Sequence, residues 1–358
     1  MDLAKRGSNV SNIVVTLGPS SMEPGVAERL VVAGADAFRF PASKLPIDEL
    51  ARLAVEIAST AEKLGRPQDL LLDLPGAKSR FTNDVEFSLA GIPKIRVDFA
   101  PTPSDEHAAV PRLGLSGNDM GHFLEPGDVI LIGDGEDALR VDEVHGDHCL
   151  TTPLTGGMLA RRRGAVVSGK MPRFDDLTSS DAAALRLAPS TVFSAVILSF
   201  VESASIVEQA RALMRESGRD DLPAVVAKVE TRAGALAVAD IARSADAILL
   251  GRGDLLLEAG EVDFYALCRD VIKTAADLSC PVIVGTQLFD SLADSWLPHR
   301  SELAYISQLW EAGIDGLMLA YETTVGAQPV RTVEALSTLR SRYAPSPDGK
   351  PMFPTRLP

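Results

Sequence analysis

The chain has 358 residues, 46% of them apolar, which is enough for one large domain and a smaller one. It carries 35 Lys and Arg residues against 49 Asp and Glu residues, a net charge of −14. This acidic balance argues against a nucleic-acid platform and favours a cytoplasmic protein, although a small anion can still bind in a locally basic cleft.

The three cysteines, Cys149, Cys268 and Cys280, lie far apart and show no Cys-x-x-Cys spacing. We therefore expect reduced packing residues rather than a disulfide scaffold or a metal cluster. The first residues, MDLAKRGSNVSN, lack the apolar core of a signal peptide. No apolar run reaches the roughly 18 to 20 residues of a membrane span. We expect a cytoplasmic chain without a membrane anchor.

Short apolar runs recur along the chain and predict eight β-strands. They cover residues 12–16, 35–39, 70–73, 195–199, 224–228, 246–250, 281–285 and 315–319. The runs are continuous rather than alternating, which indicates parallel strands buried on both faces. Most precede a segment of helical period: Ser203 is the expected cap of one helix, and segment 301–313 begins with a capping residue and ends at Gly313.

Eight strand–helix units predict an α/β fold, a TIM (β/α)8 barrel built from residues 1–80 and 169–343. An open three-layer sheet is the alternative. Residues 81–168 are rich in Gly and Pro and contain the β-like stretches KIRVDFA, DVILIGDG, ALRVDEV and AVVSG. They predict a small β-rich domain inserted after the third strand, serving as a lid or as a simple spacer. The segment 344–358 holds five prolines and is expected to be a flexible tail.

Barrel active sites lie at the C-terminal ends of the strands. Polar and charged residues gather at these ends: Arg39, Asp73, Lys78, Arg80, Ser199, Lys228, Glu230, Asp254, Thr286, Gln287 and Glu322. Considered singly, Asp73 and Glu322 are weaker candidates, because each could be a helix cap or a residue that supports the site without touching substrate. The concentration of such groups at most of the strand ends favours an active site.

Lys228 and Glu230 are two residues apart on an extended chain, so their side chains point the same way. Asp254 follows the next strand and is expected to meet Glu230. Two carboxylates with substrate oxygens form a hard oxygen site for Mg²⁺ or Mn²⁺. Lys228 and Arg39 would bring positive charge to a phosphoryl group, and Gly253 would let backbone N–H groups approach a carboxylate. A plain ion pair between Lys228 and Glu230 is the alternative.

Several segments resemble the pyruvate kinases, and the resemblance extends from Asn12 to about Leu339. NIVVTLGPSS is similar to the family's opening strand, and LLLDLPGAKSR to its Asp-Thr-Lys-Gly-Pro-Glu-Ile-Arg segment. LEPGDVILIGDG and LTGGMLARRRGAVVSG resemble its lid domain. AKVETRAG, GRGDLLLE, GTQLFDSL and MLAYETTVGAQP resemble its four late-barrel motifs. The resemblance implies a glycolytic transferase that moves the phosphoryl group of phosphoenolpyruvate to ADP, giving pyruvate and ATP.

The resemblance also implies roles for single residues. Glu230 and Asp254 match the divalent-metal ligands, and Lys228 matches the lysine beside the transferring phosphoryl group. Arg39 matches an arginine that contacts phosphate. Thr286 matches the region that binds the substrate carboxylate and protonates the methyl carbon, together with the backbone of Gly253 and Asp254, and Ser199 is assigned to the same substrate-binding set. Arg80, Arg163 and Lys44 match groups that face the nucleotide, at positions where the family usually has lysine for Arg163 and histidine for Lys44.

Other positions depart from the family pattern. Pro41 and Leu74 stand where K⁺-dependent members have the asparagine and threonine that bind the monovalent cation, and Lys78 stands in place of a glutamate. Because members that work without K⁺ carry lysine there, we expect the Lys78 ammonium, together with Asp73, to take the place of the ion. Further changes occur at residues 74–77 and 298–302, on the nucleotide side, which leaves the phosphoryl acceptor open.

Typical members continue with a C-terminal domain that binds sugar phosphates and builds a tetramer. Because this sequence stops soon after its eighth predicted helix, we expect no regulation by sugar phosphates and a monomer or homodimer. The expected partners are small molecules, with no nucleic acid or membrane. Three alternatives to a pyruvate kinase remain: a paralogue that phosphorylates another keto or enol acid, a Mg²⁺-dependent enolate lyase or aldolase, and a non-catalytic binding protein.

Overall fold

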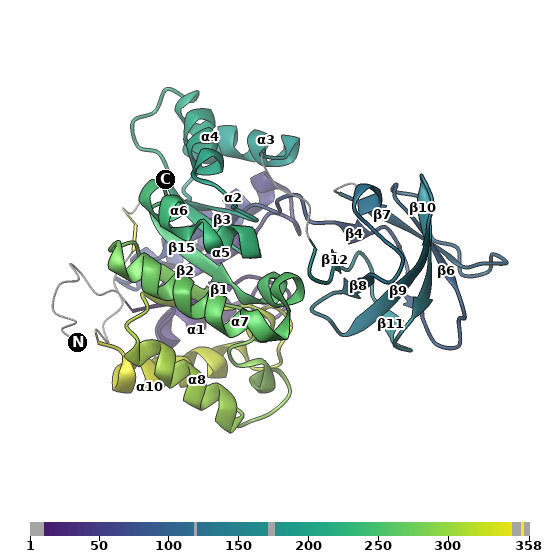
Figure 1. Ribbon diagram of the computed structural model, residues 1–358. Helices are drawn as coiled ribbons and strands as arrows, with labels where there is room; N and C mark the ends of the chain where they lie inside the picture. The colour runs from purple at the N-terminus through teal and green to yellow at the C-terminus, as the bar shows by residue number, and fades with distance from the viewer. Residues whose placement is uncertain (1–10, 118–119, 171–175, 346–351, 354–358) are drawn as a thin grey trace. The chain divides into compact units, whose positions relative to one another are not determined.

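The computed structural model describes residues 11–117, 120–170, 176–345 and 352–353. The chain divides into two compact units (Figure 1). The first unit comprises Met1–Gly76, Asp175–Arg252 and Leu267–Pro358. The second comprises Ala77–Phe174 together with Gly253–Ala266, so it includes a late segment that the sequence did not predict to belong there.

The first unit is a closed barrel of eight parallel strands, which confirms the predicted fold class. Its strands are β1 (Asn12–Thr16), β2 (Ala37–Pro41), β3 (Asp69–Asp73), β13 (Ala195–Leu198), β14 (Ala224–Val229), β15 (Ala247–Gly251), β16 (Val282–Gly285) and β17 (Gly316–Leu319). Each barrel strand pairs with the barrel strand that follows it in the sequence, and β17 closes the barrel by pairing with β1. Every predicted apolar run is one of these strands, with ends that differ by no more than two residues.

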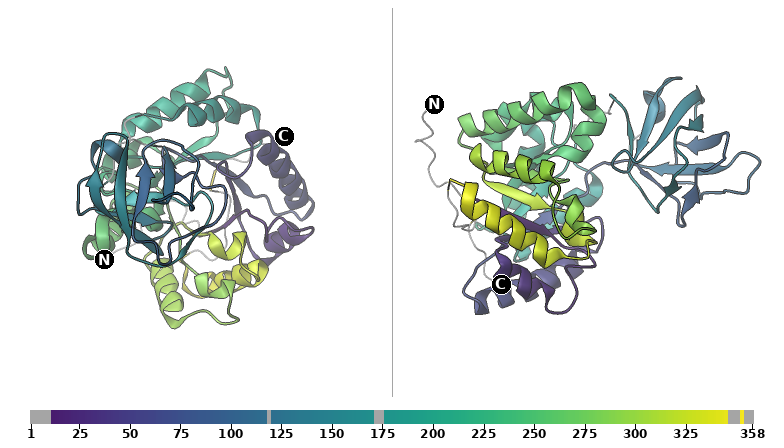
Figure 2. Two further views of the ribbon diagram at one scale, coloured as in Figure 1. Left: turned by 90° about the vertical axis from the view of Figure 1, so that its right-hand side faces the viewer. Right: turned by 90° about the horizontal axis from the view of Figure 1, so that it is seen from below.

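Helices lie on the outside of the barrel strands (Figure 2). They are α1 (Val26–Ala33), α2 (Ile47–Lys63), α3 (Ser179–Leu187), α4 (Ala204–Arg215), α5 (Arg232–Leu236), α6 (Val238–Ser244), α7 (Arg252–Asp277), α8 (Arg300–Glu311), α9 (Tyr321–Thr324) and α10 (Pro329–Tyr343), with 3-10 turns η2 (Ala188–Ser190) and η3 (Asp290–Ala293). Helix α7 is interrupted at Gly260, where the backbone has φ 75°. In the part of the chain that is described, no helix is both long and apolar enough to cross a membrane.

Two helix starts test the predicted caps. Ser203 is the N-cap of α4, as expected, although its side chain makes no capping hydrogen bond. Helix α8 begins earlier than expected, because its N-cap is His299 rather than Ser301. The carboxylate of Glu302 accepts a hydrogen bond of 2.8 Å from the backbone N–H of His299, and this bond starts the helix one residue before the predicted segment.

The second unit is β-rich and is inserted after β3, as predicted. It contains β4 (Arg80–Phe81), β5 (Phe87–Ser88), β6 (Ile95–Asp98), β7 (Arg112–Ser116), β8 (Val129–Ile132), β9 (Asp137–Val144), β10 (His148–Pro153), β11 (Met158–Leu159), β12 (Ala165–Val167) and the turn η1 (Met120–His122). Seven of these strands form one sheet in the order β12-β8-β9-β10-β6-β7-β4, and β11 pairs with β5. The unit has its own apolar cluster, which includes Phe81, Phe87 and Leu113.

The interior of the barrel is an apolar layer to which all eight strands contribute. Its members are Val14, Ala37, Leu71, Ala195, Ile197, Val226, Ala247, Leu249, Ile283 and Met318, with Phe353 from the end of the chain. Side chains two residues apart on a strand share a face. The residue two positions after the last interior member of each strand therefore also points toward the barrel axis, at the C-terminal end where active sites lie.

The opposite end of the barrel carries a repeated hydrogen bond between neighbouring strands. In each of the pairs β1/β2, β3/β13, β14/β15 and β16/β17, the residue just before the second strand accepts a backbone N–H of the first strand. The bonds run from Ile13 to Asp36, from Leu70 to Ser194, from Val225 to Asp246 and from Val282 to Asp315, at 2.7 to 3.0 Å. Each acceptor satisfies the N–H of a buried strand residue, so the same contact recurs in four strand pairs around the barrel.

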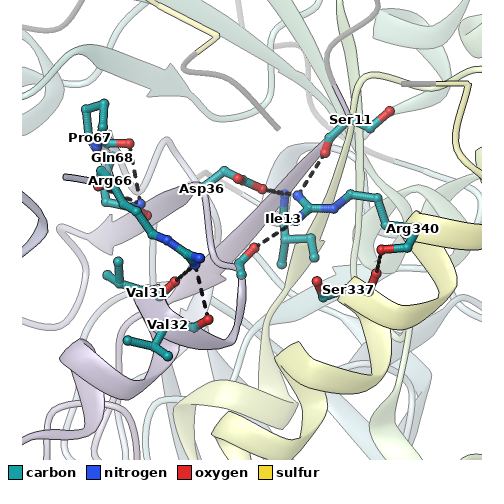
Figure 3. A network of polar contacts seen from close by, with 12 residues as sticks. Ser11, Ile13, Val31, Val32, Asp36, Arg66, Pro67, Gln68, Ser337 and Arg340 are labelled. Atoms are coloured by element: carbon teal, nitrogen blue, oxygen red, sulfur yellow. Dashed lines mark hydrogen bonds and ion pairs between the residues drawn. The ribbon is translucent and has the colours of Figure 1, made fainter. Parts of the chain in front are cut away.

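One of these acceptors belongs to a polar network that connects α10 to the barrel (Figure 3). The Arg340 guanidinium binds the Asp36 carboxylate and donates a bond of 3.0 Å to the Ser11 carbonyl. Arg66 donates to the carbonyls of Val31 and Val32, each at 3.1 Å, at the end of α1. Cationic side chains are favourable at a helix C-terminus, so Arg66 stabilises the last turn of α1.

Part of the segment predicted to be a flexible tail packs against the barrel. Met352 and Phe353 donate their backbone N–H groups to the Asp69 carboxylate, and Phe353 is only 6% exposed within the barrel's apolar layer. Ser194 donates its hydroxyl to the same carboxylate at 3.1 Å. These two residues therefore differ from the prediction, because an aromatic ring gains free energy by leaving water for the apolar barrel end. The other residues beyond 345 lie outside those described.

Candidate active site

Four predicted site residues lie in one layer at the C-terminal end of the barrel. Arg39, Asp73, Ser199 and Lys228 each stand two positions after an interior residue, namely Ala37, Leu71, Ile197 and Val226. They therefore project toward the barrel axis above the apolar layer. Four neighbouring strands, β2, β3, β13 and β14, bring these groups together although the chain separates them by up to 189 residues.

Lys228, a member of this layer, forms an ion pair with Glu230. The Lys228 Nζ lies 2.8 Å from a carboxylate oxygen of Glu230, and the side chains are 13% and 3% exposed. The other Glu230 oxygen accepts the backbone N–H of Phe200 at 3.2 Å. Gly251 leaves room for this carboxylate, because a Cβ at that position would lie 2.6 Å from Glu230 Cγ. The ion pair between Lys228 and Glu230, which the sequence left as an alternative, is present as a largely buried contact.

A second ion pair, between Arg39 and Asp73, joins the neighbouring strands β2 and β3. Arg39 donates from Nη2 and Nε to one oxygen of Asp73, at 2.6 and 3.0 Å, and from Nη1 to the Thr16 hydroxyl at 3.2 Å. Asp73 is 5% exposed, and its other carboxylate oxygen is buried without a hydrogen-bond partner in the described part of the chain. A buried acceptor of this kind is costly unless a further donor or cation satisfies it. Asp73 is thus an ion-pair partner rather than the helix cap that it could have been.

The charges around Lys228 decide its protonation. Burial lowers the pKa of Lys228, but the nearby Glu230 and Asp73 carboxylates outweigh burial and the opposing charge of Arg39, so the pKa lies above its ordinary value. Lys228 is therefore a permanent cation at neutral pH. A buried ammonium that stays charged can stabilise a phosphoryl or enolate oxygen, whereas a neutral amine cannot.

Ser199 has a simpler position. Its hydroxyl donates a hydrogen bond of 2.7 Å to the carbonyl of Leu74, and its side chain packs beside Gly76, which has φ 65°. The bond joins the end of β13 to the turn after β3. The contacts of Ser199 are therefore those of a residue that shapes this turn, and its assignment to the substrate remains a prediction.

Thr286 and Gln287 form a left-handed turn directly after β16. Their φ angles are 73° and 51°, in the left-handed region of backbone conformation. Residues other than glycine rarely adopt this region, and a β-branched residue such as Thr adopts it least. Backbone outliers of this kind cluster at functional sites. Glu322 accepts the backbone N–H of Ala320, the N-cap residue of α9, at 2.8 Å, and it also accepts those of Leu288 and Phe289 at 3.3 and 2.8 Å.

The second unit holds its own group of predicted site residues. Lys78 Nζ forms an ion pair of 2.6 Å with Asp254, and both side chains are less than 15% exposed. Arg163 pairs with Glu136, and Arg80 donates to the carbonyl of Arg162 at 3.4 Å. Lys78 is therefore a close neighbour of Asp254, and its expected replacement of K⁺, together with Asp73, stays a prediction.

Other predicted residues lie in separate places. Glu230 belongs to the barrel unit and Asp254, with Gly253, to the second unit, so their expected meeting stays a prediction. Lys44 is an exposed residue in the turn after β2, where its N–H donates to the Pro41 carbonyl at 3.0 Å.

The donor chemistry of Glu230 and Asp254 is compatible with Mg²⁺. Both present carboxylate oxygens, and Mg²⁺ is typically bound by one or two carboxylates together with water and substrate phosphate oxygens. Within the described residues no group of three or more His, Cys, Asp or Glu side chains could hold a metal ion.

The comparison with protein families settles the ancestry of this barrel. The family described as "Pyruvate kinase, barrel domain" matches residues 8–333, which is most of the chain. The chain belongs to the pyruvate kinase family. The family resemblance predicted from the sequence is thus confirmed.

Curated relatives support the membership over nearly the whole chain. A protein of Aeropyrum pernix named pyruvate kinase is 28% identical over 350 residues, which cover 97% of this chain and 74% of the relative. A pyruvate kinase of Haemophilus influenzae is 30% identical over 333 residues, covering 92% and 69%. One of Thermotoga maritima is 28% identical over 330 residues, covering 91% and 69%.

Sequence reasoning about this pyruvate kinase family member missed two parts of the site. Arg252 was read only as part of the GRGD segment, yet its guanidinium binds the carbonyls of the turn at Thr286. The pairing of Lys78 with Asp254 was also missed. Both contacts join residues far apart in sequence, and no local pattern signals them. The positive φ of Thr286 could not be predicted, because neither glycine nor asparagine, the residues that usually adopt this conformation, stands there.

Proposed function

We propose that the chain transfers a phosphoryl group between phosphoenolpyruvate and ADP, giving pyruvate and ATP. The observation that carries this proposal is the set of charges at the C-terminal end of the barrel, where the Arg39–Asp73 pair joins β2 and β3 and the Lys228–Glu230 pair lies at the end of β14. Membership of the pyruvate kinase family supports it. A purely structural role would not require four largely buried charges at the end of a barrel, because apolar side chains of similar volume often stabilise a buried site at least as well.

In this proposal the two cations act on the phosphoryl group. Lys228 stays protonated because the Glu230 and Asp73 carboxylates keep its pKa high, so its ammonium can lie beside the transferring phosphoryl oxygens. Arg39 offers a planar guanidinium that can form two bonds with a phosphate, in place of those it now makes with Asp73. Phosphoryl transfer needs placement and charge neutralisation more than covalent help, and this pair supplies both.

Glu230 and Asp254 are the proposed ligands of Mg²⁺ or Mn²⁺. Bound divalent metal supplies positive charge to phosphate and enolate oxygens. Glu230 is already fixed by Lys228 and by the Phe200 N–H, so its carboxylate is held in one orientation. Asp254 is held by Lys78 in the same way. Preformed carboxylates reduce the ordering cost of metal binding.

The remaining assignments concern the two substrates. Gly253, Asp254 and Thr286, with Ser199, are proposed to bind the substrate carboxylate and to surround the methyl carbon that is protonated. Arg80, Arg163 and Lys44 are proposed to bind the nucleotide phosphates. These assignments derive from the sequence motifs.

A substrate screen tests the proposed function directly. ATP formation from phosphoenolpyruvate and ADP is measured with Mg²⁺ and with Mn²⁺, beside other enol and keto acids and other nucleoside diphosphates. Pyruvate release from a hydroxy-keto acid is measured in parallel, because it would identify a lyase or aldolase instead. Transfer to another acid would identify a specialised paralogue. Binding of phosphoenolpyruvate without turnover of any substrate would contradict the proposed catalysis.

The substitution Lys228→Met tests the residue assignment. It removes the ammonium but keeps the apolar stem, so we expect turnover to fall by about 10³-fold or more. Binding of Mn²⁺, measured by paramagnetic resonance, is expected to persist. Lys273→Met is the matched control, because Lys273 is an exposed α7 residue that pairs with Asp277. Turnover of Lys228→Met near that of Lys273→Met would show that the assigned role is wrong.

We further propose that the activity does not depend on K⁺. Pro41 and Leu74 offer no side-chain oxygen at the two positions where the family binds the ion, and Lys78 supplies a fixed ammonium. Initial rates in KCl and in tetramethylammonium chloride of the same ionic strength are therefore expected to agree. A several-fold higher rate in KCl would refute this proposal.

A further inference from the structure

Arg252 binds three consecutive carbonyl groups of another segment. It is the first residue of α7 and follows the last residue of β15. Its Nε donates to the Gly285 carbonyl at 3.0 Å, and its Nη2 donates to the carbonyls of Thr286 and Gln287, the latter at 2.9 Å. No other residue type has a planar donor group that can serve three carbonyls at once.

The segment that Arg252 holds is the left-handed turn. Thr286 and Gln287 both have positive φ, and neither is a glycine. Such a turn persists only where the surroundings compensate for its steric cost. Buried backbone carbonyls need hydrogen-bond donors, and at this turn a side chain provides them. Arg252 supplies those donors from the neighbouring strand end.

A second group holds the next residues of the same segment from the other side. Glu322 follows β17, the barrel neighbour of β16 opposite to β15. Its carboxylate accepts the N–H groups of Leu288 and Phe289 and is fully buried. A cation therefore binds the carbonyls of the turn and an anion binds the amides that follow it. The backbone from 285 to 289 is fixed by charge on both flanks.

The guanidinium of Arg252 is itself oriented. Its Cζ lies 4.8 Å from the ring centroid of Tyr305, on α8, in cation–π geometry. The ring restricts the plane of the guanidinium, and the plane decides which carbonyls the donors reach. Arg252 is thus placed by packing as well as by its hydrogen bonds.

We propose that Arg252 is a positioning residue that holds Thr286 in the left-handed conformation needed for its action on substrate. The proposal rests on the proposed function, in which Thr286 belongs to the region that binds the substrate carboxylate and protonates the methyl carbon. Arg252 touches the carbonyls of the turn and acts on the reaction through Thr286. The turn returns to an extended backbone when the three bonds are lost, because a β-branched residue favours negative φ.

The test compares Arg252→Lys with the wild-type protein. Lysine keeps the charge but can serve only part of the three carbonyls, so we expect kcat to fall about 10- to 100-fold while the KM for ADP changes by less than about threefold. Amide hydrogen exchange of the peptide covering residues 285–289 is expected to become at least about tenfold faster. Arg243→Lys is the matched control, since Arg243 is exposed on α6 and pairs only locally with Asp240.

A second variant distinguishes an effect on the conformation of the turn from an effect on the stability of the whole barrel. Glycine adopts φ 51° without steric cost, so Gln287→Gly in the Arg252→Lys background is expected to recover several-fold in kcat, although it adds no donor. It also allows a readout if Arg252→Lys alone folds poorly. Recovery is not expected if Arg252 serves only the global stability of the barrel.

The outcomes separate this inference from the proposed function. If the wild-type protein makes no ATP from phosphoenolpyruvate and ADP, the proposed function fails, and hydrogen exchange at 285–289 still tests the turn. Unchanged kcat in Arg252→Lys, or unchanged exchange at 285–289, would overturn the inference. So would a loss confined to the KM for phosphoenolpyruvate, because Arg252 would then bind substrate itself.

Discussion

Replacement of Arg340 by methionine tests the polar network that joins α10 to the barrel. Arg340 is 7% exposed, and its guanidinium binds the Asp36 carboxylate and the carbonyls of Ser11 and Gly34. Asp36 in turn accepts the N–H of Ile13 at 2.8 Å, one of the four bonds between strand pairs (Figure 3). Methionine keeps most of the side-chain volume, so the substitution removes the charge without a large cavity.

The expected loss follows from the burial of the pair. The side chains of Arg340 and Asp36 are 8% and 16% exposed, so removal of Arg340 leaves a largely buried carboxylate without its counter-ion. Breaking a buried ion pair from one side costs about 3–5 kcal/mol, and the partial exposure of Asp36 favours the lower end, about 3 kcal/mol. Arg342→Met is the matched control, two residues along the same helix and exposed, and is expected to cost less than about 0.5 kcal/mol.

The loss is also expected to depend on pH. Burial raises the pKa of Asp36 above its ordinary value, while Arg340 and the Ile13 N–H oppose that rise. Without Arg340 the pKa rises further. A carboxyl whose folded pKa is raised stabilises the fold below its unfolded pKa, and this contribution is lost as the pH rises through the folded pKa. The difference between Arg340→Met and wild type should therefore be full near about pH 8 and shrink toward about pH 5.

Urea denaturation followed by tryptophan fluorescence measures the effect, because Trp310 on α8 is fully buried in the barrel unit. Asp36→Asn in the Arg340→Met background should recover part of the loss at neutral pH, since an amide needs no counter-ion and can still accept the Ile13 N–H. A loss below about 1 kcal/mol, or one that is constant between these pH values, would refute the reasoning about a buried charge.

Two further substitutions test contacts that the sequence did not predict. Phe353→Ala is expected to lower the free energy of unfolding of the barrel by up to about 3–5 kcal/mol, because it empties a site in the apolar layer; urea denaturation beside the more exposed Tyr343→Ala checks this, and equal values would show that the segment does not dock. Lys78→Met is expected to lower turnover at least about tenfold, since Asp254 loses its cation. Added KCl should not restore the rate, because Pro41 and Leu74 offer no side-chain oxygen, and restoration by KCl would disprove that account.

Much of the fold could be predicted because its signals are local. A strand buried on both faces needs several consecutive apolar residues, and each of the eight runs from residues 12–16 to 315–319 contains them. The common orientation of Lys228 and Glu230 could also be predicted, since a spacing of two on an extended chain places both side chains on one face. The ends of the elements were harder: α8 begins at Arg300 because Glu302 binds the N–H of His299, which is a matter of side-chain geometry.

The candidate site divides in the same way. That Arg39 and Asp73 lie at strand ends follows from the sequence, but their pairing at 2.6 Å depends on β2 and β3 being neighbours in register. Glu322 binds the N–H of Ala320 at the start of α9, and it also accepts the N–H groups of Leu288 and Phe289, which the sequence did not predict. The pairing of Lys78 with Asp254 was not predicted either. Each of these contacts joins segments that only chain folding brings together.

By itself, the sequence indicated an eight-stranded α/β barrel with a β-rich insertion, and it placed the side chains of Lys228 and Glu230 on one face. These conclusions rest on apolar periodicity and residue spacing, which are local properties of the chain, whereas the resemblance to the pyruvate kinases rests on motif segments. Only the tertiary structure decided that Arg252 holds the turn at Thr286, that Asp36 and its counterparts join the strand pairs, and that Phe353 enters the barrel interior. A hydrogen bond or an apolar contact depends on distance in space, and distance in space between remote residues is fixed only when the barrel closes.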